Sequence, residues 1–354
     1  MKSGGIKMKI NRRNFLILSS LAAGGLSFGF TYINEKNKIV LEGIQKFLHT
    51  VSNKDGSFRP GVDPNYKGRS DTELSGIAAP TYATIICKTF GWDLPYTNNT
   101  IDFFLSCQKS DGAFYAPTGK MDPNSPLAKL YNTVQASVAL RLLGQMPKYD
   151  PVPVIHSFFE GGEFKELPLY TTSFFALFFS AWDQKMPKHF DKQMREYIIS
   201  RQKEDGYLGN HVASTFHAAH YFRLIGETTP KANEMINRTI SDQKEDGSWH
   251  LFSPNYDVHA CFDALFILRQ LGNPLDIRIK KAYEKATEWI LKCQKPDGGF
   301  SHFPGDEPSD MDAVYFHMGG LVQTGYLKIA SDIENEEILG WGHAMDPTKK
   351  YSCI

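Results

Sequence analysis

Two kinds of hydrophobic pattern alternate along most of the chain. The last pair is the clearest: residues 283–292 place apolar side chains at helical spacing with charges between them, whereas residues 312–327 are mostly apolar. Residues 296–299 lie between the two runs and read Pro-Asp-Gly-Gly, which breaks a helix and supplies a tight turn. The pattern predicts a hairpin of one amphipathic and one apolar helix.

The turn of this hairpin is repeated. A degenerate copy stands at Gly161–Phe164, and the repeat recurs at intervals of roughly 40 to 60 residues, a range typical of repeat architectures. We therefore expect about six hairpins, with the apolar helices in an inner ring and the amphipathic helices in an outer ring. We interpret the turns as structural, with the closing aromatic packed against the neighbouring repeat. The five clear copies are NKDGSF (53–58), QKSDGAF (108–114), QKEDGYL (202–208), QKEDGSW (243–249) and QKPDGGF (294–300).

The Q-x-x-D-G-[SAG]-[FW] repeat on paired helices resembles the α/α-toroid of protein prenyltransferase β subunits and of squalene–hopene and related terpene cyclases. The resemblance covers nearly everything after Lys38 and implies one all-α toroid domain over residues 37–354. It is specific for the fold, whereas function must be argued from the site. It also implies an apolar, isoprenoid-type small molecule or a modified peptide as partner.

Composition narrows the partners further. Lys plus Arg and Asp plus Glu both number 39, so nothing favours a nucleic acid. Aromatic residues reach 13%, which fits helices around an apolar cavity. Of the five cysteines, Cys107 and Cys293 stand directly before the repeat Gln, which favours packing over a disulfide or a metal. The aromatic residues expected in the core or along the cavity are Phe174, Phe175, Phe178, Trp182, Phe216, Phe262, Phe266, Tyr315 and Phe316.

Residues 1–36 differ from the rest. Asn11-Arg12-Arg13-Asn14 precedes an apolar run over residues 15–33, the pattern of a Tat-type export signal. The run is also long enough to stay as a membrane anchor. The sequence predicts a protein that is periplasmic, extracellular or membrane-anchored on the outer side. The alternative is a cytosolic chain with an apolar first helix.

A metal site is suggested by Asp257 and His259, which begin an apolar helix. In the resembling prenyltransferase β subunits this position carries D-x-C, two zinc ligands, and aspartate and histidine both bind zinc. The family's third ligand falls on Ala313, so we assign that role to His317, one helical turn further along. The alternative is a helix-capping Asp with a buried, hydrogen-bonded His.

His211 is the candidate contact for a leaving group. The stretch from Asn210 to His217 resembles the prenyltransferase segment in which a His contacts the prenyl diphosphate. That family also places Arg and Lys before D-x-C as a phosphate clamp, whereas Leu251 and Pro254 stand there in this chain. Because cationic donors make the strong bonds to phosphate, diphosphate binding is disfavoured.

A second chemistry is suggested by Ser309-Asp310-Met311-Asp312-Ala313. It resembles the D-x-D-D motif of class II terpene cyclases, whose carboxylic acid protonates an alkene or epoxide, although Ala313 replaces the last acid. Two carboxylates in an apolar cavity can retain one proton at neutral pH. The alternative is a helix N-cap with a second carboxylate in the first turn.

Three functions remain open at this point. The first is a zinc-dependent, prenyltransferase-like enzyme with Asp257, His259 and His317 as ligands and His211 at the leaving group. The second is a cyclase-like isomerase that uses Asp310 and Asp312 as its acid. The third is a binding or interaction module without catalysis.

Overall fold

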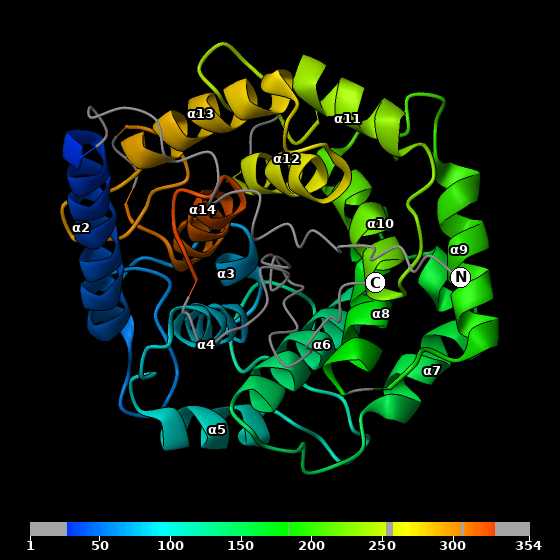
Figure 1. Cartoon of the computed structure of the whole chain (residues 1–354). Coiled ribbons are helices and arrows are strands. Elements are labelled where there is room, and N and C mark those ends of the chain that lie inside the picture. The colour runs from blue at the N-terminus through cyan, green and yellow to red at the C-terminus, as the bar shows by residue number, and fades with distance from the viewer. Residues whose placement is uncertain (1–26, 183, 253–257, 306–307, 330–354) are drawn as a thin grey trace, which may run out of the picture. The chain divides into compact units, whose positions relative to one another are not determined.

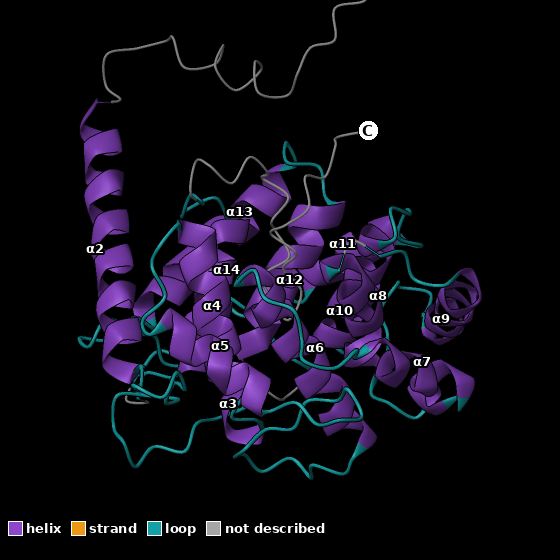
Figure 2. Ribbon diagram, turned by 90° about the horizontal axis from the view of Figure 1, so that it is seen from below, coloured by secondary structure: helices purple, strands orange, loops and turns teal. Residues whose placement is uncertain are grey.

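The computed structural model describes residues 27–182, 184–252, 258–305 and 308–329. Within these residues there are 13 α-helices and two short 3₁₀ helices. They contain no strand, and Figure 2 accordingly shows helices and loops alone. The all-α prediction is therefore confirmed. The helices are α2 (Ser27–Val51), α3 (Asp71–Leu74), α4 (Ala78–Phe90), α5 (Thr97–Ser106), α6 (Pro126–Leu142), α7 (Val152–Glu160), η1 (Glu163–Lys165), η2 (Leu169–Thr171), α8 (Thr172–Ala181), α9 (Lys188–Arg201), α10 (Val212–Leu224), α11 (Ala232–Ser241), α12 (Val258–Leu271), α13 (Ile277–Lys292) and α14 (Met311–Gln323).

The chain divides into two units, Met1–Leu41 and Glu42–Ile354. In the second unit, six helices form an inner ring in which each packs against the next: α4, α6, α8, α10, α12 and α14. The ring closes because α14 packs against α4. Helices α5, α7, α9, α11 and α13 lie around this ring (Figure 1). The predicted α/α toroid is confirmed.

Burial separates the two kinds of helix as the hydrophobic pattern predicts. All ten residues of inner helix α8 are buried, and so are all thirteen of α14. Outer helix α13 buries only one stripe, formed by Ile279, Ala282, Ala286, Trp289 and Ile290. It begins at Ile277, six residues before the predicted run, because Asp276 caps its N-terminus.

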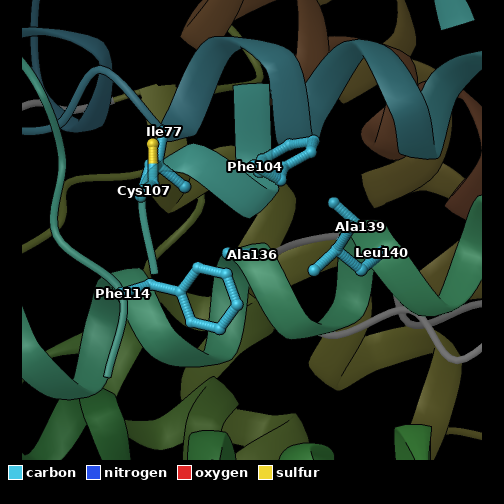
Figure 3. Packing of buried hydrophobic residues seen from close by; sticks show 7 residues of the cluster. All are labelled: Ile77, Phe104, Cys107, Phe114, Ala136, Ala139 and Leu140. Carbon is cyan, nitrogen blue, oxygen red and sulfur yellow. The ribbon is translucent and has the colours of Figure 1, made fainter. Parts of the chain in front are cut away.

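The Gln of the repeat turn forms hydrogen bonds to the segment that begins the next repeat. In the second copy, the Gln108 side-chain amide donates to the carbonyls of Gly112 and Tyr149, and its oxygen accepts from the Tyr149 N–H. Figure 3 shows Cys107 and Phe114 of this turn beside Phe104 of α5 and residues of α6. These buried contacts support the packing roles predicted for the repeat cysteine and the closing aromatic.

The turn glycines are required by close approach as well as by backbone conformation. Gly298 has φ +94°, and a Cβ there would lie 2.1 Å from the carbonyl oxygen of Gly43 in α2. Gly112, with φ +88°, would bring a Cβ within 2.2 Å of the Asp150 oxygen. The Gly298 contact joins the last repeat turn to Gly43, in the part of α2 that belongs to the second unit.

The predicted signal or anchor lies largely outside the described residues, since these begin at Ser27 within α2. The helix continues across the expected domain start at residue 37. None of the helices in the described part of the chain combines the length and hydropathy needed to cross a membrane.

Candidate functional site

Three polar side chains meet where the first turns of α12 and α14 approach α3. They are Asp71 on α3, His259 on α12 and Asp312 on α14. One ligand atom from each lies within 4.8 Å of the other two, and His259 Nε2 is 3.2 Å from Asp312 Oδ2. We call these three residues the acid cluster. Ring closure creates it, because α3 precedes the first inner helix and α14 is the last.

Asp312 is the buried member of the acid cluster. It has no exposed surface, and its Oδ1 has no hydrogen-bond partner in the described structure. Burial raises its pKa from 3.8 to about 7, because desolvation penalises the charged form more than His259 stabilises it. A carboxyl group with this pKa is partly protonated at neutral pH, so it can act as a proton donor.

Asp310 has a different role, although the sequence motif pairs it with Asp312. It caps α14 by accepting the Asp312 N–H at 2.6 Å, and it accepts the Arg69 N–H and the Thr72 hydroxyl at 3.1 Å each. His302 Nε2 is 3.7 Å from Asp310 Oδ1, the oxygen that also accepts the Asp312 N–H. Asp310 therefore holds the segment that carries Asp71 against α14, which makes it a positioning residue.

Asp71 connects the acid cluster to a group of buried tyrosines. The Tyr82 hydroxyl donates to Asp71 Oδ2 at 2.5 Å and lies 3.2 Å from the Tyr131 hydroxyl. Burial raises the pKa of both tyrosines, and the charge of Asp71 raises it further. Both phenols consequently stay protonated and can donate hydrogen bonds toward the carboxylate.

Aromatic rings cover the rest of the site. Tyr82 stacks on Tyr315 with ring centroids 3.9 Å apart, and His259 stacks on Phe316 at 3.8 Å. Phe262 contacts Phe316 edge-on at 5.7 Å. An electron-rich aromatic surface of this kind can stabilise a positive charge that develops near it.

The predicted metal ligands do not lie together in the described residues. His259 lies in the acid cluster, whereas Asp257 falls outside the described residues. His317 is not in the cluster: its Nε2 lies 3.1 Å from the Ser301 carbonyl, and its ring packs against Trp289 and Phe300. Desolvation lowers its pKa to about 3, so His317 is a neutral, buried ring. In the described residues His317 therefore lies apart from His259, and Asp312, beside Ala313, lies next to His259 instead.

His211 lies at the N-terminus of α10. Its Nδ1 accepts the Ser214 N–H at 3.2 Å, as an N-cap does. Its ring stacks with Tyr170 and with Phe252, and the ring centroids are 6.1 and 5.4 Å from that of His211. His211 is not among the side chains that the acid cluster brings together.

Two further histidines of inner helix α10 and the aromatic residues singled out above are packed in the interior. His217 Nδ1 is 2.6 Å from the Ser173 hydroxyl, and burial lowers the pKa of His220 to about 3. Trp182 is half-buried. The remaining aromatic residues singled out in the sequence are buried: Phe174, Phe175, Phe178, Phe216, Phe262, Phe266, Tyr315 and Phe316.

Sequence reasoning missed Asp71, Tyr82 and Tyr131. A usable signal was present, because Ser70-Asp71-Thr72-Glu73 is a polar run just before the apolar residues 77–87. Asp310 and Asp312 precede an inner helix in the same way. Polar residues at the entrances of inner helices are thus the shared feature of this site.

The sequence of the chain matches the model of a known protein family. The profile of the prenyltransferase alpha-alpha toroid domain matches residues 14–146 and 158–341. The chain belongs to this family. A curated relative, the geranylgeranyl transferase type-1 subunit beta of Arabidopsis thaliana, is 26% identical over 162 residues. That match spans 43% of this chain and 42% of the relative's length.

Solved structures with the same fold include cyclases. The type II terpene cyclase MstE from Scytonema superposes with a TM-score of 0.53 at 13% identity, covering 83% of this chain and 98% of the cyclase. A variant of it in complex with its product, merosterolic acid A, gives 0.55 at 14%, covering 84% and 99%. The ent-copalyl diphosphate synthase from Streptomyces platensis gives 0.50 at 12%, covering 71% and 50%. At these identities the likeness shows the toroid fold.

Proposed function

We propose that this protein is a cyclase-like isomerase in which Asp312 protonates an isoprenoid alkene. The observation that carries the proposal is the setting of Asp312: a buried carboxyl group with one oxygen near His259 and the other without a partner. The unpartnered Oδ1 is the atom that would deliver the proton. A pKa of about 7 supports this role, because a stronger acid would be fully ionised at neutral pH.

The reaction conserves atoms and charge. The O–H bond of Asp312 breaks, and the alkene's π electrons form a C–H bond, which leaves a carbocation on the neighbouring carbon. Attack by further alkenes closes rings, and loss of one proton from carbon ends the sequence. His259 stabilises the carboxylate left on Asp312, and the tyrosine and phenylalanine rings near Asp71 and Phe316 stabilise the cation.

The ligand class also draws on a relative. A variant of MstE has been solved with geranylgeranyl dihydroxybenzoate, which is described as its substrate. We propose by analogy that this chain binds a linear isoprenoid against the aromatic inner ring. The likeness in fold suggests the ligand class, and the acid cluster suggests the reaction.

The test is conversion of linear isoprenoids by the purified protein. Geranylgeraniol, geranylgeranyl diphosphate and geranylgeranyl dihydroxybenzoate would be incubated separately and analysed by chromatography and mass spectrometry. The proposal predicts a product of unchanged mass and altered retention from at least one of them. Asp312→Asn should abolish it, whereas Asp122→Asn on an exposed loop should not. Conversion that survives Asp312→Asn would contradict the proposal.

A zinc-dependent transferase is the second candidate, favoured by the spacing of the acid cluster. Asp71, His259 and Asp312 supply the donor types and the ligand count of a catalytic zinc site. Zinc held there would lower the pKa of a bound nucleophile. Elemental analysis separates the candidates, since this one predicts one zinc per chain that is lost in His259→Ala. If the protein neither converts an isoprenoid nor binds zinc, a binding module without catalysis remains.

Export through residues 1–36, with or without retention at the membrane, remains our proposal for localisation.

A further inference from the structure

Asp71 differs from Asp312 in its surroundings, although both carboxyl groups belong to the acid cluster. Asp312 has no exposed surface, and one of its oxygens has no hydrogen-bond partner in the described structure. Asp71 is half-buried and accepts the Tyr82 hydroxyl at 2.5 Å. A carboxylate oxygen of each aspartate lies within 4.8 Å of the other. Two neighbouring carboxyl groups in different environments can take opposite roles in one reaction, one as acid and the other as base.

The segment around Asp71 is held in place on both sides. Asp310 accepts the Arg69 N–H and the Thr72 hydroxyl, which flank Asp71 in the sequence. Ser70, directly before Asp71, has φ +54°, a backbone conformation that a serine rarely adopts. Strain of this kind persists only where the surrounding structure holds it, and it is concentrated at active sites. These constraints fix the Asp71 carboxylate within the acid cluster.

The other polar groups of the site are already engaged with the two carboxyl groups. His259 Nε2 lies 3.2 Å from Asp312 Oδ2, so this nitrogen serves the acid. The Tyr82 phenol donates its proton to Asp71, and the Tyr131 hydroxyl lies 3.2 Å from the same phenol oxygen. Asp71 is therefore the acceptor at the end of this hydrogen-bonded group.

We propose that Asp71 is the base that removes the last proton from the carbocation, and that the product has at most one ring. This inference rests on the proposed function, because it assigns the step that ends the same reaction. A C–H bond beside the cationic carbon breaks, its electrons form a C=C bond, and the proton passes to an oxygen of Asp71. The half-buried Asp71 then releases this proton to solvent, and a solvent proton restores Asp312.

The short distance between the acid and the base limits how far the positive charge travels. A base must lie within hydrogen-bond reach of the proton that it removes. Because the oxygens of Asp71 and Asp312 lie within 4.8 Å, a substrate that contacts both presents carbons that are neighbours or belong to one ring. A row of fused rings would carry the cation away from Asp71. The geometry therefore favours a shift of one double bond or the closure of a single ring.

The experiment separates the start of the reaction from its end. It uses whichever of the three linear isoprenoids named above the wild-type protein converts, in buffer containing EDTA so that zinc at these residues makes no contribution. Loss of substrate measures protonation by Asp312, and mass spectrometry and NMR identify the product. The wild-type product should have unchanged mass and at most one ring.

Asp71→Asn should consume the substrate at a comparable rate, because Asp312 is intact, but it should release a product heavier by one water. Water captures the cation when no base removes its proton. The ratio of the wild-type product to this water adduct should fall by about a hundredfold, the low end of what a positioned base contributes.

Tyr82→Phe is the second variant, because it keeps the ring that stacks on Tyr315 and removes only the hydroxyl that Asp71 accepts. It should form the water adduct beside the wild-type product. Tyr221→Phe is the matched control: Tyr221 is also buried and donates to an aspartate, Asp191, at 2.7 Å. It should form the wild-type product alone. Circular dichroism checks that each variant is folded.

Several results would overturn the assignment. They are the wild-type product alone from Asp71→Asn, a folded Asp71→Asn protein that consumes no substrate, or a wild-type product with fused rings. If Asp71→Asn does not fold, the wild-type product alone from Tyr82→Phe would overturn it. Conversion that needs Asp312 but ignores Asp71 would keep the cyclase and remove this base, whereas no conversion by the wild-type protein would remove both.

Discussion

Removing the charge at Asp312 should stabilise the protein at neutral and alkaline pH. The carboxyl group is fully buried, and its pKa is raised from 3.8 to about 7. Ionising Asp312 therefore requires more free energy in the folded state than in the unfolded chain. Asp312→Asn keeps the shape and a polar atom beside His259 but cannot ionise.

The direction and size of the effect follow from proton linkage. Between pH 4 and pH 7 the folded state holds a proton on Asp312 that the unfolded state has lost, so wild-type stability falls as pH rises through this window. At roughly 1.36 kcal/mol per pKa unit, a rise of about three units corresponds to about 4 kcal/mol. Protonation of His259 would reduce this figure, because the resulting ion pair favours the charged carboxylate. The variant should match wild type near pH 4 and exceed it above pH 7.

Urea unfolding followed by circular dichroism at pH 4.5, 6 and 8 measures this directly, because the difference in unfolding free energy between the two proteins isolates the Asp312 contribution. Asp122→Asn controls for replacing an exposed carboxylate by an amide. A wild-type-minus-variant difference that stays constant across this range would refute the reasoning, since it would mean that Asp312 ionises as readily in the folded protein as in the unfolded chain.

Further predictions concern the ring and the N-terminus. Gly298→Ala should destabilise the protein by more than about 3 kcal/mol in thermal unfolding, because its Cβ would clash with a backbone oxygen, whereas Gly144→Ala, with positive φ and open space, should cost about 1 kcal/mol. Gln108→Ala should cost about 2 to 3 kcal/mol in urea unfolding, since it removes three hydrogen bonds from the repeat turn. Replacing Arg12 and Arg13 with lysine should stop export of a reporter fused to residues 1–36, and export that continues would contradict a Tat-type signal.

The fold was predictable because its determinants are local. Each Asp-Gly turn carries its own signal, since the glycine adopts positive φ and the aspartate accepts a nearby backbone N–H, as Asp111 does from Ala113. Gln108, which precedes this Asp-Gly pair, binds the turn to the next repeat through a hydrogen bond to the Tyr149 carbonyl. Repetition of one local motif was then enough to predict the ring.

The candidate site was predictable only in part. Asp312 and His259 were found because each stands in a recognisable motif at the start of an inner helix. Asp71 was missed because its segment meets α14 through contacts between residues far apart in the chain, such as Arg69 and Asp310, 241 positions apart. The motif also could not separate Asp310 from Asp312, because the difference is one of hydrogen bonding: Asp310 accepts several donors, whereas Asp312 keeps one oxygen without a partner.

The central claim is that Asp312 transfers a proton to carbon, and isotope incorporation tests it most directly. In D₂O, wild-type protein should convert a linear isoprenoid into a product one mass unit heavier, with a single deuterium at the carbon protonated first. Asp312→Asn should form no such product, and Asp122→Asn should form it normally. Product without deuterium, or deuterated product from Asp312→Asn, would contradict the account.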